Sequence, residues 1–514
     1  MKTSLKRRLG VAMLCGLLAV PVHADVSSTR LPDLGDVSQE GLSPAQEREI
    51  GESAMKQLRR SGEMLDDPEL QAYLNRIGNR LVDASGSGIS FTFFPVNNRE
   101  VNAFSIPGGY IGINTGLLVT AQHESELASV LGHEIAHVTQ HHIARLIDGT
   151  RFTPWMVLAA IGVALLASRS GNTGNAVSAA ITGSQALAMQ KQLDFTYAFE
   201  QEADRIGMET LTAAGFDPSA MPAFFERLQK ANRIYEVNAP EFLRTHPVTY
   251  KRIADAQARL KDAPYRQVAD SADFLFMRER ARVLQDKAQD MAVFYRKSLA
   301  EKRYTNLTAF RYGLALALLQ AGDAAGAEKA LKDAHAAFGL TRSNPVLEAL
   351  EGQILLAAGR NGDAIAHYAR AISAYPEYRV LRYGQVDALM AAGQLDQALK
   401  VAQENQQVYP ADAVFYQREA RIHAKAGRQQ QQYRAQAEYY VRLNEFMPAI
   451  EQLQMAQRLP NGDFYTQSSI EARLRELQQQ ADPEGHERGG SRLGQGAFAD
   501  SAAKNGPSQA GPGY

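Results

Sequence analysis

The pentapeptide at residues 133–137, His-Glu-Ile-Ala-His, is the stretch of this sequence best suited to chemistry. Residues four positions apart lie on the same face of a helix, so His133 and His137 could hold one metal ion together. Glu134 could then take a proton from the attacking water and return it to a leaving amine. The pattern therefore indicates a zinc-dependent peptidase. The competing interpretation is an amphipathic helix with two incidental histidines.

A third metal ligand must come from His, Glu or Asp, because the only cysteine, Cys15, lies inside an N-terminal apolar run. The segment 200–204 offers Glu200 and Asp204 on one helical face. One carboxylate can bind the ion while the other accepts a hydrogen bond from a ligand imidazole. Spacing alone leaves the choice between the two open. The same helical spacing places Glu202 off this face, where we expect it to meet solvent.

Two more histidines follow the pentapeptide directly. If the helix continues, His141 lies on the same stripe as His133 and His137. A third ligand from one straight helix would be geometrically strained, so we expect His141 and His142 to be structural or solvated.

The ends of the chain differ in composition from its middle. Residues 1–24 combine basic residues, an apolar run and a small-residue site, which predicts a signal peptide cleaved after Ala24 and an exported protein. Residues 25–42 are expected to be a loose lead-in, and the Gly/Ser/Pro-rich tail 482–514 is expected to be disordered. The formal net charge is −1, and no long basic run follows the signal, so we expect no nucleic-acid partner.

The elements that must position the candidate ligands can be placed from local patterns. Ser43 and Asp67, each followed by proline, predict the starts of two helices. Aromatic and β-branched residues predict strands at 89–96 and 110–113. The helix with the metal-binding pattern is expected from about 125 to 147.

An almost uninterrupted apolar segment spans residues 155–167. It is short for a membrane span, so a buried helix is the favoured interpretation. A lid or surface-dipping helix with peripheral membrane contact is the alternative.

The C-terminal half contains an internal repeat. The dipeptide Ala-Gly recurs four times, and the last two intervals are each 34 residues, the tetratricopeptide period, at positions 321–322, 358–359, 392–393 and 426–427. Such units are helix pairs that bury their apolar faces by stacking. We predict a mainly α protein: an α+β zincin-type metallopeptidase domain with a small β-sheet at 43–265, then an α-solenoid of repeats at 270–480. A generic helical bundle is the alternative to the solenoid.

The metal-binding pattern and the Glu-x-x-Ala-Asp segment about sixty residues later resemble the HtpX and Oma-type gluzincin metallopeptidases. Asn-Ala-Phe at 102–104, Pro-Gly-Gly at 107–109 and Thr-His-Pro at 245–247 strengthen the resemblance. It implies one Zn²⁺ per chain, with Glu200 as the third ligand and Asp204 as the partner of a ligand imidazole.

The resemblance also bears on His246 and on one strand. It implies that His246 is an oxyanion donor or, as we slightly favour, a fourth zinc ligand that keeps the enzyme latent; a structural turn residue is the alternative. The strand Tyr110-Ile111-Gly112-Ile113, if it is an edge strand as in relatives, would pair with an extended substrate.

The signal peptide and the repeats narrow the resemblance to exported members of this family. They imply a periplasmic zinc endopeptidase, with chaperone-like activity, that assists assembly of outer-membrane β-barrel proteins and degrades misassembled ones. Its substrates would be unfolded or stalled outer-membrane proteins, and its repeats would contact the β-barrel assembly machinery. The alternative is a largely latent peptidase that acts mainly as a repeat-based chaperone or adaptor.

Overall fold

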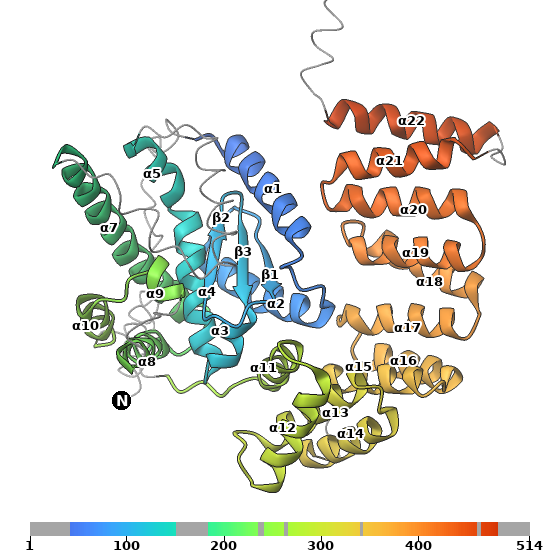
Figure 1. The fold of residues 1–514 in the computed structure, drawn as a ribbon, viewed down its shortest axis with the longest axis horizontal. Helices are drawn as coiled ribbons and strands as arrows, with labels where there is room; N and C mark the ends of the chain where they lie inside the picture. The colour runs from blue at the N-terminus through green and yellow to red at the C-terminus, as the bar shows by residue number, and fades with distance from the viewer. Residues whose placement is uncertain are drawn as a thin grey trace, which may run out of the picture.

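The computed structural model describes residues 42–150, 183–234, 241–261, 266–339, 343–459 and 464–481. In these ranges the protein is mainly α-helical, with one three-stranded sheet and a curved stack of helices (Figure 1). The predicted signal peptide, the apolar segment 155–167 and the predicted tail lie outside the described residues. No helix in the described ranges is long and apolar enough to cross a membrane.

The two predicted N-terminal helix starts are confirmed. α1 (Pro44–Ser61) begins after Ser43, which exchanges hydrogen bonds with Gln46 in a capping box. α2 (Pro68–Ser85) begins after Asp67, whose carboxylate accepts a hydrogen bond from a backbone N–H in the first turn. The apolar face of α2 packs into the core beside the sheet.

The sheet has the strand order β1-β3-β2. β1 (Thr92–Val96) runs parallel to β3 (Tyr110–Asn114), and β2 (Ala103–Ile106) runs antiparallel to it. The predicted strand at 110–113 is therefore the central strand, and the expectation that it forms an edge is wrong. Its backbone is paired on both sides, and Gly112 lies against the ring of Phe104, where a Cβ atom would approach the ring to 2.4 Å.

The outer side of β1 is covered. The Asn75 side chain donates to the carbonyl of Phe93 at 2.9 Å and accepts from its N–H at 3.2 Å. The N–H of Leu65 donates to the carbonyl of Pro95 at 3.0 Å, and proline has no N–H to offer. This edge is therefore blocked along its length.

The outer side of β2, which the sequence did not indicate as a strand, is open. The N–H of Asn114 donates to the carbonyl of Asn102 at 3.1 Å. Because hydrogen-bonded pairs alternate in an antiparallel ladder, the backbone groups of Ala103 and Ser105 then point away from β3. Within the described ranges no strand pairs with this side.

The helix with the metal-binding pattern, α4 (Glu124–Thr139), lies against β2 and against α7 (Gly183–Ala213). Glycines at the crossing let the two helices approach closely. A Cβ atom added at Gly132 would lie 3.0 Å from the backbone oxygen of Gly207, so a larger residue would push the helices apart.

The predicted continuous helix from 125 to 147 is wrong. α4 ends at Thr139, and His141 adopts φ +50°, in the left-handed region. α5 (His142–Thr150) then starts in a new direction. His141 therefore does not lie on the stripe of His133 and His137.

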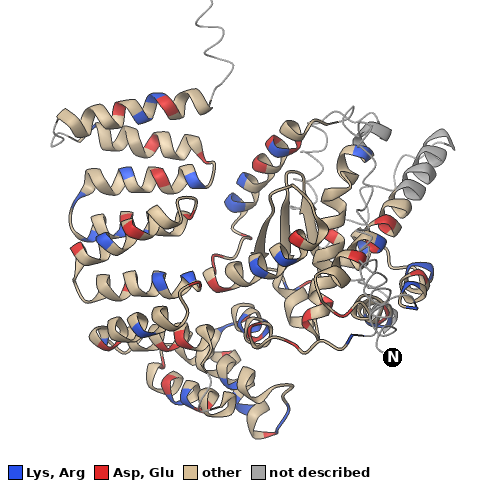
Figure 2. Cartoon of the chain, turned by 180° about the vertical axis from the view of Figure 1, so that it is seen from behind, with Lys and Arg blue, Asp and Glu red and all other residues tan. Residues whose placement is uncertain are grey.

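Short helices complete the peptidase region and longer ones form the stack. These are α3 (Thr115–Thr120), α8 (Ala220–Ile234), α9 (Glu241–Thr245), α10 (Tyr250–Arg259), α11 (Ala272–Leu284), α12 (Ala288–Ala300), α13 (Leu307–Gln320), α14 (Ala324–Phe338), α15 (Pro345–Ala357), α16 (Asn361–Ala374), α17 (Arg379–Ala391), α18 (Leu395–Val408), α19 (Ala413–Lys425), α20 (Gln429–Arg442), α21 (Phe446–Gln457) and α22 (Phe464–Ala481). In the space-filling view acidic and basic side chains are interspersed over both parts, as they are along the helices in Figure 2.

The predicted repeat appears as a series of antiparallel helix pairs. The glycine of each Ala-Gly dipeptide lies in the turn of one pair with φ between 70° and 83°, at Gly322, Gly359, Gly393 and Gly427. An L side chain is disfavoured there, which explains why glycine recurs at this position.

The helix stack contacts the peptidase region along α11 and again near its far end. Near α2, Arg280 of α11 forms ion pairs with Asp67 and Glu69 at 2.8 and 3.1 Å. At the far end, Arg59 of α1 donates to the carbonyl of Leu443 at 2.9 Å.

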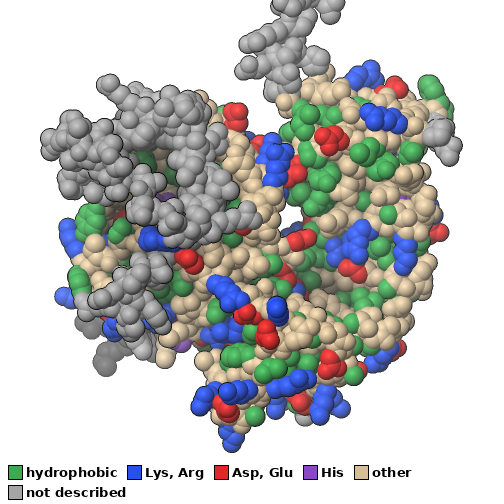
Figure 3. Space-filling view, in the orientation of Figure 1, with side chains coloured by type: hydrophobic (Ala, Val, Ile, Leu, Met, Phe, Trp, Pro, Cys, Tyr) green, Lys and Arg blue, Asp and Glu red, His purple; other side chains and the backbone are tan. Residues whose placement is uncertain are grey.

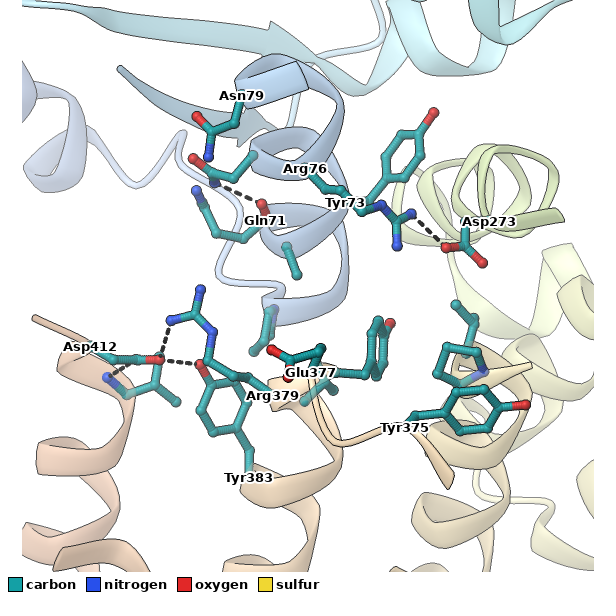
Figure 4. Close-up of a pocket in the computed structure, with 18 of the residues that line it drawn as sticks. Gln71, Tyr73, Arg76, Asn79, Asp273, Tyr375, Glu377, Arg379, Tyr383 and Asp412 are labelled. Atoms are coloured by element: carbon teal, nitrogen blue, oxygen red, sulfur yellow. Dashed lines mark hydrogen bonds and ion pairs between the residues drawn. The ribbon is translucent and has the colours of Figure 1, made fainter. Parts of the chain in front are cut away.

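Between these two contacts lies a cavity of about 860 Å³, and Figure 3 shows the hollow between the two parts. It is lined by α2 on one side and by turns of the repeats on the other (Figure 4). Arg76 pairs with Asp273 on one wall, and Arg379 pairs with Asp412 on the other.

Candidate active site

Three separate elements bring four candidate ligands together. α4 carries His133 and His137, α7 carries Glu200, and His246 follows α9 directly. One ligand atom from each of the four lies within 4.8 Å of the others. Three imidazole nitrogens and a carboxylate are a donor set that suits a divalent transition metal.

The contacts within this cluster are short. His133 Nε2 lies 3.0 Å from His137 Nε2, and each nitrogen lies 3.4 Å from an oxygen of Glu200. His246 Nδ1 lies 3.0 Å from Glu200 Oε1 and 3.4 Å from His133 Nε2. The three imidazoles hold the pKa of Glu200 well below its usual range, against the opposing effect of its burial. The carboxylate is therefore ionised, as a metal ligand requires.

Glu134 lies beside the cluster and is fully buried. Its Oε1 is 3.5 Å from His246 Nε2. Burial raises the pKa of Glu134, although the neighbouring imidazoles of His246 and His133 oppose the rise. A raised carboxyl pKa is what a group that accepts and returns a proton near neutral pH needs.

Behind His133 lies a buried ion pair. His133 Nδ1 is 3.0 Å from Asp204 Oδ1, so the predicted partner of a ligand imidazole is in contact with one. Arg252 of α10 donates to both oxygens of Asp204 at 2.7 and 2.8 Å. The same guanidinium also contacts Glu200 Oε2 at 2.8 Å and donates to the carbonyl of Pro247 at 3.0 Å.

Arg252 was missed from the sequence, although a signal for it exists. It is completely buried and lies in the first turn of α10, between the apolar positions of that helix. A cation in the first turn opposes the helix dipole, and Asp255, the nearest acid in sequence, accepts a hydrogen bond from Gln201 instead. A buried guanidinium at this position needs a carboxylate from another element, and Asp204 of α7 supplies it.

Glu202 lies elsewhere than expected, and His142 lies beside a ligand candidate. His142 is buried, and its Nδ1 is 2.9 Å from Nδ1 of His137. Glu202 turns toward it and accepts a hydrogen bond from Arg145 at 2.9 Å, so it is half-buried rather than directed into solvent. His141 points away and pairs with Glu47 at 3.1 Å.

The structure thus places His133, Glu134, His137, Glu200, Asp204 and His246 at one site. The predicted substrate strand at 110–113 is not beside it. The strand that lies against α4 is β2, with its open edge at Ala103 and Ser105.

Comparison with known proteins agrees with this geometry. The model of peptidase family M48 matches residues 68–260, and a tetratricopeptide repeat model matches 355–428. The "Beta-barrel assembly-enhancing protease" of Escherichia coli (strain K12) is 33% identical over 484 residues, which are 93% of this chain and 97% of the relative. The chain belongs to the family of β-barrel assembly-enhancing proteases.

Other members and relatives fit the same assignment. The β-barrel assembly-enhancing protease of Yersinia pestis is 32% identical over 87% of this chain and 91% of the relative. The mitochondrial metalloendopeptidase OMA1 of Arabidopsis thaliana is 31% identical over 43% of this chain and 42% of the relative. The resemblance inferred from the sequence is confirmed, and the chain is a metallopeptidase with C-terminal repeats.

Proposed function

We propose that the protein is a periplasmic zinc endopeptidase that assists the assembly of outer-membrane β-barrel proteins and degrades misassembled ones. The observation that carries the peptidase chemistry is the convergence of His133, His137, Glu200 and His246, with the buried Glu134 beside them. The names of its relatives, β-barrel assembly-enhancing proteases, support the class of substrate.

His133, His137 and Glu200 would hold the zinc ion, and the donor set without cysteine fits that metal. When bound, the ion supplies Lewis acidity toward a scissile carbonyl. Glu134 takes the proton of the attacking water and returns it to the leaving amine. Asp204 accepts a hydrogen bond from His133 Nδ1 and thereby fixes that ring.

β2 replaces β3 as the proposed substrate-binding strand. Its outward backbone groups at Ala103 and Ser105 lie on the side of the sheet that packs on α4, the helix carrying Glu134. An extended polypeptide added there by backbone hydrogen bonds would pass beside the metal site. Pairing of this kind favours unfolded or stalled chains, because folded proteins offer few free strands.

His246 is the proposed device that keeps the enzyme latent. Its Nδ1 faces Glu200 and His133 in the same cluster as the other ligand atoms, which supports a fourth ligand more than an oxyanion donor. A fourth protein ligand would take the position that a catalytic zinc keeps open.

The repeats are the proposed contact for the β-barrel assembly machinery. The cavity between α2 and the repeat turns offers polar and aromatic side chains from both parts, which supports a second, chaperone-like activity (Figure 4). A largely latent peptidase acting as an adaptor remains the second candidate function.

The test compares the wild type with Glu134→Gln, using casein and a stalled β-barrel protein as substrates. We expect the variant to bind zinc with unchanged stoichiometry and to cleave about 10²–10⁴-fold more slowly. Retained assistance of assembly by the variant would support both activities in one chain. No cleavage by the zinc-loaded wild type or by zinc-loaded His246→Ala would contradict the peptidase proposal and favour the adaptor.

A further inference from the structure

A chain of contacts leads away from His137 on the side opposite the other ligand candidates. His142 Nδ1 is 2.9 Å from His137 Nδ1, and His142 Nε2 is 3.3 Å from Glu202 Oε2. Arg145 donates to the same oxygen at 2.9 Å. His142 is 3% exposed. Its ring stacks on Phe199 with a centroid distance of 4.4 Å and an interplanar angle of 16°, so its orientation is fixed by packing.

The left-handed turn at His141 makes this arrangement possible. A continuous helix would carry residue 142 about 140° around the axis from residue 137 and more than a turn further along it. With φ of +50° at His141, the helix is interrupted before α5 begins, and the ring of His142 lies against that of His137, with ring centroids 4.8 Å apart.

The direction of each hydrogen bond follows from the ligand assignment, so this inference rests on the proposed function. Nε2 of His137 faces the metal cluster and must be free of a proton there. The proton of the neutral ring is therefore on Nδ1, and the atom facing it must accept. His142 then accepts at Nδ1 and carries its own proton on Nε2, which donates to Glu202.

We propose that His142 is a positioning residue that fixes the tautomer and the ring orientation of His137. Only one arrangement of protons satisfies both of its contacts, and that arrangement presents His137 Nε2 to the metal. Loss of a hydrogen-bond partner of this kind lowers metal affinity by about 10–100-fold.

The two ligand histidines are thereby held in related ways. His133 is backed directly by a carboxylate, Asp204, which pairs with Arg252. His137 is backed by His142, and only then by a carboxylate, Glu202, which pairs with Arg145. The imidazole of His142 thus lies between His137 and its carboxylate, and the break between α4 and α5 creates the space for it.

The experiment uses two substitutions of His142: one keeps a hydrogen-bond acceptor but loses the ring, and the other keeps a ring but loses the acceptor. His142→Asn places an amide oxygen where Nδ1 stands and can still accept the proton of His137. His142→Phe keeps the ring stacked on Phe199 but removes the acceptor. His141→Asn is the control, since asparagine tolerates a positive φ and this residue faces away from the metal site.

Zinc affinity of the full-length mature protein is measured by competition with a chromophoric chelator, and the thermal midpoint of the metal-free protein is measured beside it. We expect His142→Phe to raise the dissociation constant by about 10–100-fold. His142→Asn and His141→Asn should stay close to the wild type. The metal-free midpoints should be similar, because the Phe variant keeps the stacking.

A nitrogen NMR spectrum of the zinc-loaded protein, labelled at histidine, adds an independent readout. We expect His142 as the Nε2–H tautomer and His137 as the Nδ1–H tautomer. Wild-type affinity in His142→Phe, equal losses in both His142 variants, or a proton on Nδ1 of His142 would each overturn the inference. Unchanged zinc binding in His137→Ala would instead overturn the ligand assignment in the proposed function.

Discussion

At the scale of single residues, Arg252 is the cation on which the site depends. Its guanidinium is completely buried and contacts Asp204, Glu200 and the carbonyl after His246. Burying such charges costs several kcal/mol per ion, which their mutual contacts must offset. Removing one partner leaves the others uncompensated.

Arg252→Met should therefore lower the free energy of unfolding of the metal-free protein by about 3–5 kcal/mol. Urea denaturation of the purified variant measures this. Arg205→Met is the matched control, because Arg205 is partly exposed on α7 and, among the described residues, pairs with Glu209 one turn away, a contact worth about 0.3–0.5 kcal/mol. Similar losses in the two variants would contradict the role given to Arg252.

The substitution His246→Ala tests whether His246 keeps the enzyme latent as a fourth zinc ligand. Three candidate ligands remain in this variant, so zinc should stay bound while the fourth position opens. We expect casein cleavage to rise severalfold at constant zinc content. A steep fall in cleavage would rule out the latent-ligand hypothesis and favour the oxyanion role.

At the scale of elements, the two edges of the sheet differ in whether their outward backbone groups are hydrogen-bonded. Asn75 and Leu65 occupy the backbone groups of β1, whereas Ala103 and Ser105 of β2 keep theirs free toward the side that packs on α4. Within the described ranges only the β2 edge is left without a partner strand or a blocking side chain, and it is the one beside the proposed catalytic glutamate.

Ser105→Pro should weaken substrate pairing without breaking the sheet, because the N–H of Ser105 points away from β3. Loss of one backbone hydrogen bond of about 1 kcal/mol corresponds to about a fivefold fall in kcat/KM for extended peptides. Ser105→Ala keeps the N–H and serves as the control. Equal kcat/KM values for the two variants would mean that β2 does not bind substrate.

His133 and His137 could be predicted from local spacing, because they share a helical face, and Glu200 and Asp204 share another. The choice of Glu200 over Asp204 and the role of His246 came from the family resemblance. The break at His141 could not be predicted, because no glycine or proline marks the residue that adopts the positive φ. The same break determines the position of His142.

Strand β2 escaped prediction for a related reason. It has four residues, and its burial does not alternate, so a period of two is absent. Its strand character comes from pairing with β3, which the sequence of Ala103–Ile106 does not contain. The helix starts at Ser43 and Asp67 were predictable because their caps are formed within four residues.

At the scale of the whole molecule, one buried ionic cluster joins the peptidase region to the repeats. Arg280 contacts two carboxylates, those of Asp67 and Glu69, and Glu69 also accepts hydrogen bonds from Gln353 and Tyr378 of the repeats. Burial raises the pKa of Glu69 to about 7; Arg280 opposes this rise and Asp67 adds to it. Glu69 therefore titrates close to neutral pH at the boundary between the two parts.

A carboxyl group whose pKa is higher in the folded protein than in the unfolded chain contributes less to the stability of the folded protein as its proton is lost. The contribution of Glu69 is fully present below about pH 4.5, falls as pH rises toward 7 and is absent above that. Relative to Glu69→Gln, the wild type should thus lose about 2–3 kcal/mol of stability between pH 5 and pH 8. Urea denaturation at both pH values measures this, with exposed Asp66→Asn as control. A constant difference between wild type and variant would contradict the prediction.

The single open edge of the sheet has a consequence for what happens when β-rich chains accumulate. A sheet with two open edges can add strands on both sides and act as a link in a growing polymer. Here, within the described ranges, the amide of Asn75 closes one side, so each molecule can take up a strand at β2 and cannot join two stacks of strands. A protein that meets aggregation-prone chains in this way would terminate a growing stack of strands rather than extend it.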